Sequence, residues 1–193
     1  MAELPEQKPN NDVFNVPNQL TAARFVLAIV VFVLIHLHLF LAALIVFLIA
    51  ASTDWIDGYY ARKYGQVTKI GRMFDPFVDK IIICGTFIFL AAEQGSGIEA
   101  WMAVVVVGRE MLVTALRSSI EQSGGDFSAS FAGKLKMLFQ CAAVVASLLM
   151  LWFGMDRAPT WLPTTVLVLV WVAVLSTIQS GLDYIFAAAK FFR

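Results

Sequence analysis

The sequence predicts an all-α integral membrane protein, built as a bundle of six transmembrane helices. Hydrophobic residues make up 60% of the 193 residues and charged residues only 15%, and the mean hydropathy is +0.78. So small a fold cannot hide that much apolar surface from water. The apolar residues form runs close to the roughly 20 residues that cross a bilayer as a helix, without the alternation of a membrane β-barrel.

The charge composition excludes several other classes of protein. The 14 Lys and Arg residues balance the 14 Asp and Glu residues, so the formal net charge is zero. No global field therefore attracts nucleic acid. The hydrophobic content likewise excludes intrinsic disorder. Residues 1–12 are polar and lack the apolar core of a secretory signal, so we expect the first apolar stretch to remain in the protein as an anchor.

Six apolar segments are long enough to be membrane spans. A polar tail, residues 1–13, precedes a transmembrane domain of residues 14–193, and we expect a short surface helix near Asp12–Asn18 to lead into the first span. A tight turn near His36–His38 joins the first two spans. The predicted spans are Leu20–Leu37, Leu39–Trp55, Phe74–Ala92, Glu99–Ile120, Phe131–Phe153 and Leu162–Ala189.

Cationic residues predict the orientation of these spans, because cytoplasmic loops of membrane proteins carry an excess of Lys and Arg. With a cytoplasmic N-terminus, six spans leave only Arg157 of the Lys and Arg residues on the far side. We therefore expect a multi-pass protein of the cell membrane with both termini in the cytoplasm. The residues placed inside include Arg62, Lys63, Lys69, Arg72, Arg117, Lys134, Lys136, Lys190 and Arg193.

Two pairs of carboxylates lie at the predicted cytoplasmic ends of neighbouring spans. Asp54 and Asp57 are three residues apart, and Asp75 and Asp79 are four apart, so each pair shares one helical face. The second and third spans are antiparallel neighbours. All four side chains are therefore expected to converge at one depth.

Four adjacent carboxylates repel one another unless cations neutralise them. Oxygen ligands without His or Cys suit two hard divalent ions, Mg²⁺ or Mn²⁺, of the kind that stabilise phosphoryl transfer. Gly58 and Gly71 would let a bulky ligand approach the helices, and Arg62 adds a cation for a phosphate. Two alternatives stay open: an interfacial loop in which the acids pair with nearby Lys and Arg, and the ion pathway of a divalent-cation transporter.

This stretch resembles the signature of the CDP-alcohol phosphotransferases. That signature reads D-x-x-D-G-x-x-A-R, then eight residues, then G-x-x-x-D-x-x-x-D, and every fixed position is present here. The resemblance extends from about Phe14 to Tyr184 and implies the fold of that family. The matching residues are Asp54, Asp57, Gly58, Ala61, Arg62, Gly71, Asp75 and Asp79.

Within that family the chain is most similar to the phosphatidylglycerophosphate synthases. Asn15–Arg24, Gly108–Arg117 and Gly133–Lys136 carry the narrower match, although Met137 replaces the Thr common in that branch. The resemblance implies transfer of the phosphatidyl group from CDP-diacylglycerol to sn-glycerol 3-phosphate. The alternative is the same chemistry with serine or inositol phosphate as acceptor.

The resemblance also assigns roles to residues of the signature, at a site on the cytoplasmic interface. Asp54, Asp57 and Asp75 correspond to metal ligands, with Asp54 and Asp75 bridging both ions. Asp79 corresponds to a metal-contacting general base. The family implies a homodimer. The implied CDP-diacylglycerol-binding residues are Gly58, Arg62, Thr68, Asn18 and Thr21.

An acceptor that carries a phosphate needs a second cationic pocket beside the metals. Its predicted residues are Arg109, Arg117, Lys134 and Lys136. Arg109 lies within an otherwise apolar span, where an unpaired charge is costly, so a structural bridge to Glu110 is the alternative to phosphate binding. For Lys134 and Lys136 the alternative is an anchor at the membrane surface.

Overall fold

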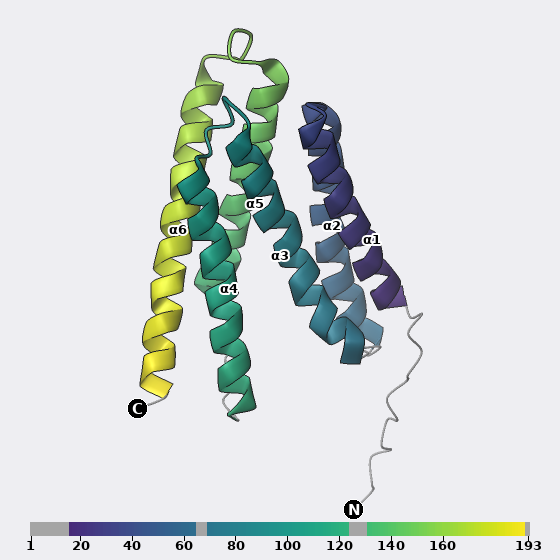
Figure 1. The fold of residues 1–193 in the computed structure, drawn as a ribbon. Helices are drawn as coiled ribbons and strands as arrows, with labels where there is room; N and C mark the ends of the chain where they lie inside the picture. The colour runs from purple at the N-terminus through teal and green to yellow at the C-terminus, as the bar shows by residue number, and fades with distance from the viewer. Residues whose placement is uncertain (1–15, 65–68, 124–130, 192–193) are drawn as a thin grey trace, which may run out of the picture.

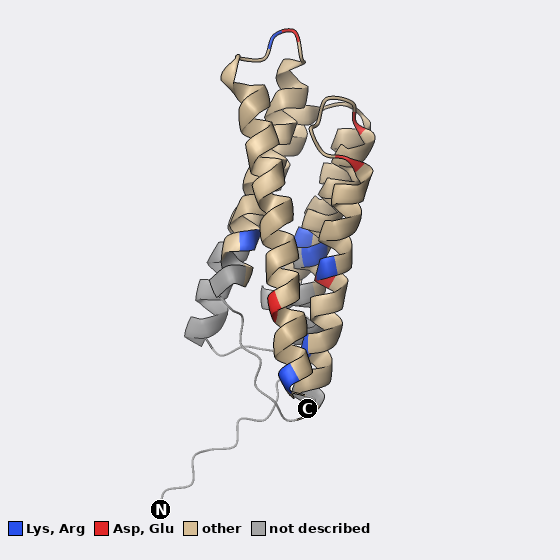
Figure 2. Cartoon of the chain, turned by 90° about the vertical axis from the view of Figure 1, so that its left-hand side faces the viewer, with Lys and Arg blue, Asp and Glu red and all other residues tan. Residues whose placement is uncertain are grey.

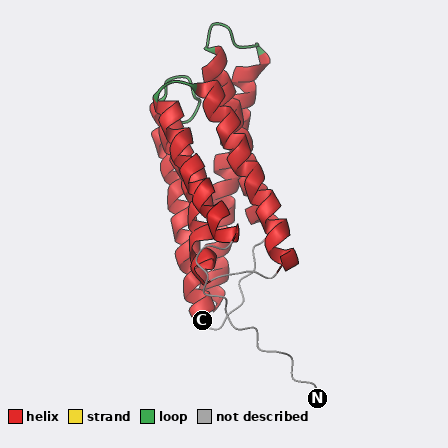
Figure 3. Ribbon diagram, turned by 90° about the vertical axis from the view of Figure 1, so that its right-hand side faces the viewer, coloured by secondary structure: helices red, strands yellow, loops and turns green. Residues whose placement is uncertain are grey.

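The computed structural model describes residues 16–64, 69–123 and 131–191, and the residues it describes form six α-helices without a β-strand (Figures 1 and 3). The all-helical prediction is therefore confirmed for this part of the chain. The helices are α1 (Val16–His36), α2 (Phe40–Tyr64), α3 (Lys69–Ala92), α4 (Ala100–Gln122), α5 (Phe131–Phe153) and α6 (Trp161–Phe191).

We call Asp54, Asp57, Asp75 and Asp79 the acidic signature, and the helices extend beyond the predicted spans on the side that carries it. α2 continues nine residues past Trp55, to Tyr64, and α3 begins five residues before Phe74, at Lys69. A helix satisfies its backbone hydrogen bonds internally, so it need not stop where the apolar residues stop. Both carboxylate pairs therefore lie in regular helix rather than in a loop.

The first two helices are joined by the predicted tight turn. α1 ends at His36, α2 begins at Phe40, and His38 between them has a positive φ of 57°. The turn is closed by the Leu39 amide, which donates to the Leu34 carbonyl oxygen at 2.9 Å. The predicted surface helix falls largely before Val16 and so outside the described residues.

The helices pack as a ring in the order α1, α2, α5, α6, α4, α3 and back to α1, with α3 also touching α5. Phe47 of α2 and Phe87 of α3 are fully buried in the shared apolar core. Gly85 of α3 lies directly against Phe32 of α1, so these two helices approach closely.

The outside of the ring is apolar. Leu167, Leu175 and Phe186 on α6 are each more than half exposed, which suits contact with lipid and not with water. Leu135–Phe153 and Trp161–Phe191 are long and apolar enough to cross a membrane, and three shorter apolar stretches lie in α1, α2 and α3. α4 is not among them, since it carries Arg109, Glu110 and Arg117 within its apolar residues.

Charge is distributed unequally between the two ends of the bundle (Figure 2). The α1–α2 turn, the α3–α4 loop and the α5–α6 connection lie at one end, and the C-terminus lies at the other (Figure 1). Among the Lys and Arg side chains that the structure describes, only Arg157 lies at the end with these three connections. This is the asymmetry that the orientation prediction requires.

Candidate functional site

A buried carboxylate joins α4 to α5. Glu110 is only 8% exposed, and its Oε1 accepts a hydrogen bond from Arg109 Nη1 at 3.0 Å. The same oxygen pairs with the ammonium group of Lys136, which is 5% exposed. One anionic oxygen therefore holds two cations from different helices in a place that water hardly reaches.

The second contact of Arg109 is with α6. Its Nη2 donates to Ser180 Oγ at 2.6 Å. A Cβ on Gly181 would lie 3.1 Å from Arg109 Cγ, so the glycine leaves room for the arginine stem against this helix. Arg109 thus bridges α4 and α6 while its charge faces Glu110.

Tyr184 on α6 contacts two arginines. Arg117 Nη2 donates to Tyr184 Oη at 2.9 Å. The guanidinium carbons of Arg109 and Arg117 lie 5.4 Å and 5.8 Å from the centre of the Tyr184 ring, within the range of a cation–π interaction. The aromatic ring therefore brings Arg109 and Arg117, two turns apart on α4, to one place.

A fourth cation reaches this site from α3. Lys80 Nζ donates to Thr114 Oγ1, and the Thr114 hydroxyl donates in turn to the Glu110 carbonyl oxygen at 2.6 Å. Lys80 is also close enough to Glu110, Arg109 and Arg117 to interact with each electrostatically. We call the group of Lys80, Arg109, Glu110, Arg117 and Lys136 the basic cluster.

The basic cluster has unused positive charge and unused donors. It contains four cations and one carboxylate. Among the described residues, the Nε atoms of Arg109 and Arg117 are buried and have no hydrogen-bond partner. Buried donors and charges without partners are costly, and an anion with several oxygen acceptors would satisfy both. Phosphate has this chemistry.

The cluster contains most of the predicted acceptor-phosphate residues. Arg109, Arg117 and Lys136 come together there, and the side chain of Lys134 lies outside the described residues. The Arg109–Glu110 bridge, which was the structural alternative, is present. Lys136 is buried in an ion pair, so the alternative of a surface anchor is wrong for this residue.

For the acidic signature, the structure gives the helix positions of the four residues without their side chains. Asp54 and Asp57 lie one turn apart in α2, and Asp75 and Asp79 lie one turn apart in α3. The four side chains lie outside the described residues, as do the side chains of Arg62 and Asn18, the surroundings of Gly58 and the whole of Thr68. Thr21 is buried in α1. The metal and nucleotide assignments therefore stay predictions.

Sequence reasoning missed three residues of this site: Lys80, Ser180 and Tyr184. A signal for the α6 residues exists, since Ser176, Thr177, Gln179 and Ser180 form a polar run inside the most apolar helix, and polar groups within a span are costly unless they have partners. In the sequence, Lys80 belongs to the Lys and Arg residues near the acidic pairs, whose alternative role is to pair with those acids. The Thr114 hydroxyl that it contacts is 34 positions away in the sequence.

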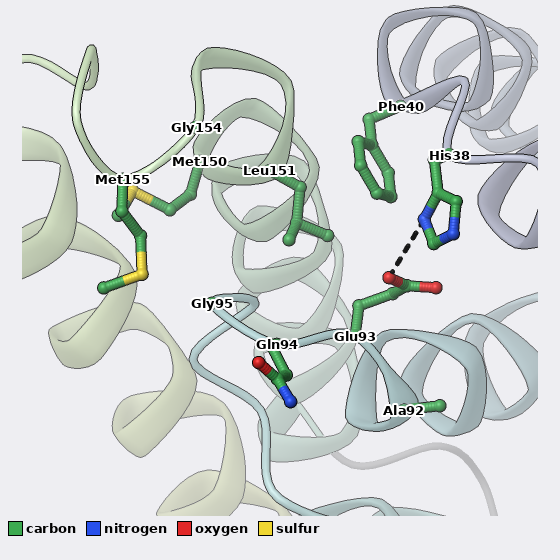
Figure 4. Close-up of a pocket in the computed structure, with 10 residues that line it drawn as sticks. All are labelled: His38, Phe40, Ala92, Glu93, Gln94, Gly95, Met150, Leu151, Gly154 and Met155. Carbon is green, nitrogen blue, oxygen red and sulfur yellow. Dashed lines mark ion pairs between the residues drawn. The ribbon is translucent and has the colours of Figure 1, made fainter.

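A hollow of about 360 Å³ lies at the opposite end of the bundle (Figure 4). His38 Nδ1 lies 3.3 Å from Glu93 Oε2 at its rim, and Phe40, Met150 and Leu151 contribute apolar surface. None of the predicted site residues lines it. Its position away from the basic cluster and the acidic signature argues against a part in phosphoryl chemistry.

Comparison with known proteins agrees with the signature. Residues 14–179 match the family model described as CDP-alcohol phosphatidyltransferase. Three relatives carry the name CDP-diacylglycerol–glycerol-3-phosphate 3-phosphatidyltransferase. The Bacillus subtilis protein is 38% identical over 89% of this chain and 94% of its own length. The proteins of Rickettsia prowazekii and Escherichia coli are each 32% identical, over 92% and 91% of this chain and 97% and 95% of their own lengths.

Proposed function

Because the chain belongs to the CDP-alcohol phosphatidyltransferase family, we propose that it transfers the phosphatidyl group of CDP-diacylglycerol to sn-glycerol 3-phosphate. The products are phosphatidylglycerol phosphate, a phospholipid precursor, and CMP. The names of its relatives support this donor and acceptor. The basic cluster supports a phosphorylated acceptor, because it has excess positive charge and two buried Nε donors. This is the observation on the chain itself on which the proposal depends.

The reaction is a phosphoryl substitution. The C1 hydroxyl oxygen of glycerol 3-phosphate forms a bond to the β-phosphorus of the donor, and the bond from that phosphorus to the oxygen of CMP breaks. Asp79 accepts the hydroxyl proton and orients the oxygen for attack. The basic cluster holds the phosphate of the acceptor. That phosphate does not react, so it binds in the same form before and after transfer.

The donor set of the signature fits hard divalent cations. Asp54, Asp57, Asp75 and Asp79 would hold two Mg²⁺ or Mn²⁺ ions, since carboxylate oxygens are the preferred ligands of both. α2 and α3 both pack on α1. Only residues 65–68 separate them, so Tyr64 and Lys69 are at most about 18 Å apart. When bound, the two ions would neutralise negative charge on the pyrophosphate oxygens.

Residues near these carboxylates are proposed to bind the nucleotide. Arg62 supplies a cation for the donor pyrophosphate, and Gly58 leaves room beside α2. Asn18 and Thr21 contribute from α1, which packs on both α2 and α3. The full set is Gly58, Arg62, Thr68, Asn18 and Thr21.

We propose that all six helices span the cell membrane. The shortest has 21 residues and the longest 31, which at 1.5 Å per residue gives about 31 to 46 Å, enough for a hydrocarbon core about 30 Å thick. The uneven distribution of cations favours cytoplasmic termini. The acidic signature and the basic cluster would then face the cytoplasm, where CDP-diacylglycerol contacts both lipid and water. A homodimer, implied by the family, is part of the same proposal.

The test is release of CMP by the purified protein in detergent. We expect release from CDP-diacylglycerol only when both glycerol 3-phosphate and Mg²⁺ or Mn²⁺ are present, with loss on chelation and recovery on adding metal back. Serine and inositol phosphate, offered in parallel, should support no comparable rate. A faster reaction with either one would reassign the acceptor. Metal flux into sealed vesicles without CDP-diacylglycerol would favour a transporter.

A further inference from the structure

Lys80 and Arg117 are the two cations of the basic cluster without a carboxylate partner among the described side chains, and Arg117 donates to Tyr184 Oη instead. Arg109 and Lys136 share Glu110, whereas the hydrogen bond of Lys80 goes to a neutral hydroxyl, Thr114 Oγ1. The side chain is half-buried. A hydroxyl accepts from one of the three ammonium protons and carries no charge of its own, so Lys80 can donate to a further acceptor.

The position of Lys80 in the chain relates the basic cluster to the acidic signature. Lys80 directly follows Asp79 on α3, and its ammonium group reaches Thr114 of α4. Three carbons separate the attacking hydroxyl of glycerol 3-phosphate from its phosphate. Consecutive residues of a helix point in different directions, so Lys80 reaches toward α4 from the same turn of α3 that carries the proposed base. A phosphate three carbons from the attacking oxygen can therefore come within its range.

We propose that Lys80 binds the phosphate of the acceptor and makes the site specific for an alcohol with a phosphate group a few carbons away. In the absence of acceptor, Thr114 holds the ammonium group in place. When acceptor binds, the ammonium group donates to a phosphate oxygen beside Arg109, Arg117 and Lys136. This proposal rests on the proposed function, since it concerns the acceptor of that reaction.

The experiment is steady-state kinetics of Lys80→Met with glycerol 3-phosphate varied at saturating CDP-diacylglycerol. Loss of one charge-assisted hydrogen bond should raise the KM for glycerol 3-phosphate about tenfold or more, with kcat within about twofold and the KM for CDP-diacylglycerol unchanged. The inhibition constant of inorganic phosphate should rise by a similar factor. Lys80→Arg should recover most of the loss.

Lys190→Met is the matched control, because Lys190 is exposed near the end of α6, and it should change neither constant. Thr114→Val should give a smaller rise in the same KM. If Lys80→Met does not fold, Thr114→Val carries the test through the inhibition constant of phosphate. An unchanged KM and inhibition constant would overturn the role of Lys80 and leave the proposed function intact. Wild-type protein that does not use glycerol 3-phosphate would instead overturn the proposed function.

Discussion

Tyr184 on α6 and Arg117 on α4 contact each other in two ways. Arg117 Nη2 donates to the phenol oxygen at 2.9 Å, and the guanidinium group also lies over the ring, 5.8 Å from its centre. Arg109 faces the same ring at 5.4 Å. A single aromatic side chain therefore keeps two like charges close together, a placement that their mutual repulsion opposes.

Tyr184→Phe should weaken acceptor binding without loss of the fold. The ring and both cation–π contacts remain, and only the hydrogen bond from Arg117 is lost. A hydrogen bond to a charged group contributes about 1.5–3 kcal/mol, so we expect the KM for glycerol 3-phosphate to rise between about tenfold and a hundredfold with little change in kcat. Tyr184→Leu, which removes the ring as well, should have a larger effect. Equal values for Tyr184→Phe and wild type would show that the phenol oxygen does not position Arg117.

The ion pair between Glu110 and Lys136 should be important for stability. Glu110→Ala leaves two buried cations facing each other, and loss of one partner of a buried pair costs about 3–5 kcal/mol. We expect a clear fall in the thermal midpoint of the detergent-solubilised protein, followed by tryptophan fluorescence. Glu110→Ala combined with Lys136→Met should recover part of that fall. A double variant less stable than Glu110→Ala alone would show that the pair is not the reason for the loss.

The helices were predictable because apolar runs of membrane length have one stable outcome in lipid. The turn at His36–His38 and the range of α5 follow directly from those runs. The polar extension of α2 to Tyr64 cannot be predicted from the apolar runs. Hydropathy shows where a helix leaves the membrane and not where the helix ends. Arg109, Arg117 and Lys136 are predicted as a group, with Lys134, because an acceptor that carries a phosphate needs cations. For Arg109 the cost of an unpaired charge within a span adds to that reason.

The remaining contacts of the site depend on how the helices pack. Tyr184 and Arg117 are 67 positions apart, and only the packing of α4 on α6 brings them together. The ion pair between Arg109 and Glu110, by contrast, is predictable from the sequence. Glu110 is the neighbour of Arg109 in sequence, so the bridge was foreseen as an alternative, but its second cation, Lys136, comes from α5.

Asp79→Asn tests the proposed general base. Asparagine keeps the size of the side chain and cannot accept a proton as a carboxylate does, so we expect kcat to fall by about 10²–10⁴. Binding of CDP-diacylglycerol, measured by equilibrium titration, should change far less. Asp183→Asn is the control, because Asp183 is exposed on α6, and it should retain full activity. Full activity in Asp79→Asn would remove the assignment of the base.

The orientation in the membrane is testable with single cysteines. Met155 is 73% exposed in the connection between α5 and α6, and Lys190 is exposed near the end of α6. After Cys84 and Cys141 are replaced by Ala, a membrane-impermeant maleimide added to intact cells should label Met155→Cys. Lys190→Cys should react only after the membrane is permeabilised. The reverse pattern would place the basic cluster and the termini outside.

Gly85 should be essential for the packing of α3 on α1. A Cβ at this position would overlap the ring of Phe32, which stacks on Phe89 at 5.1 Å between ring centres. Gly85→Ala therefore forces the ring to move, and overpacking of this kind costs about 1–3 kcal/mol. We expect a lower thermal midpoint for Gly85→Ala and recovery when Phe32→Leu is added, because leucine vacates the space that the new methyl group needs. Gly108→Ala is the matched control, since a Cβ there meets nothing within 4 Å. If both alanine variants lose stability equally, the loss comes from something other than the contact with Phe32.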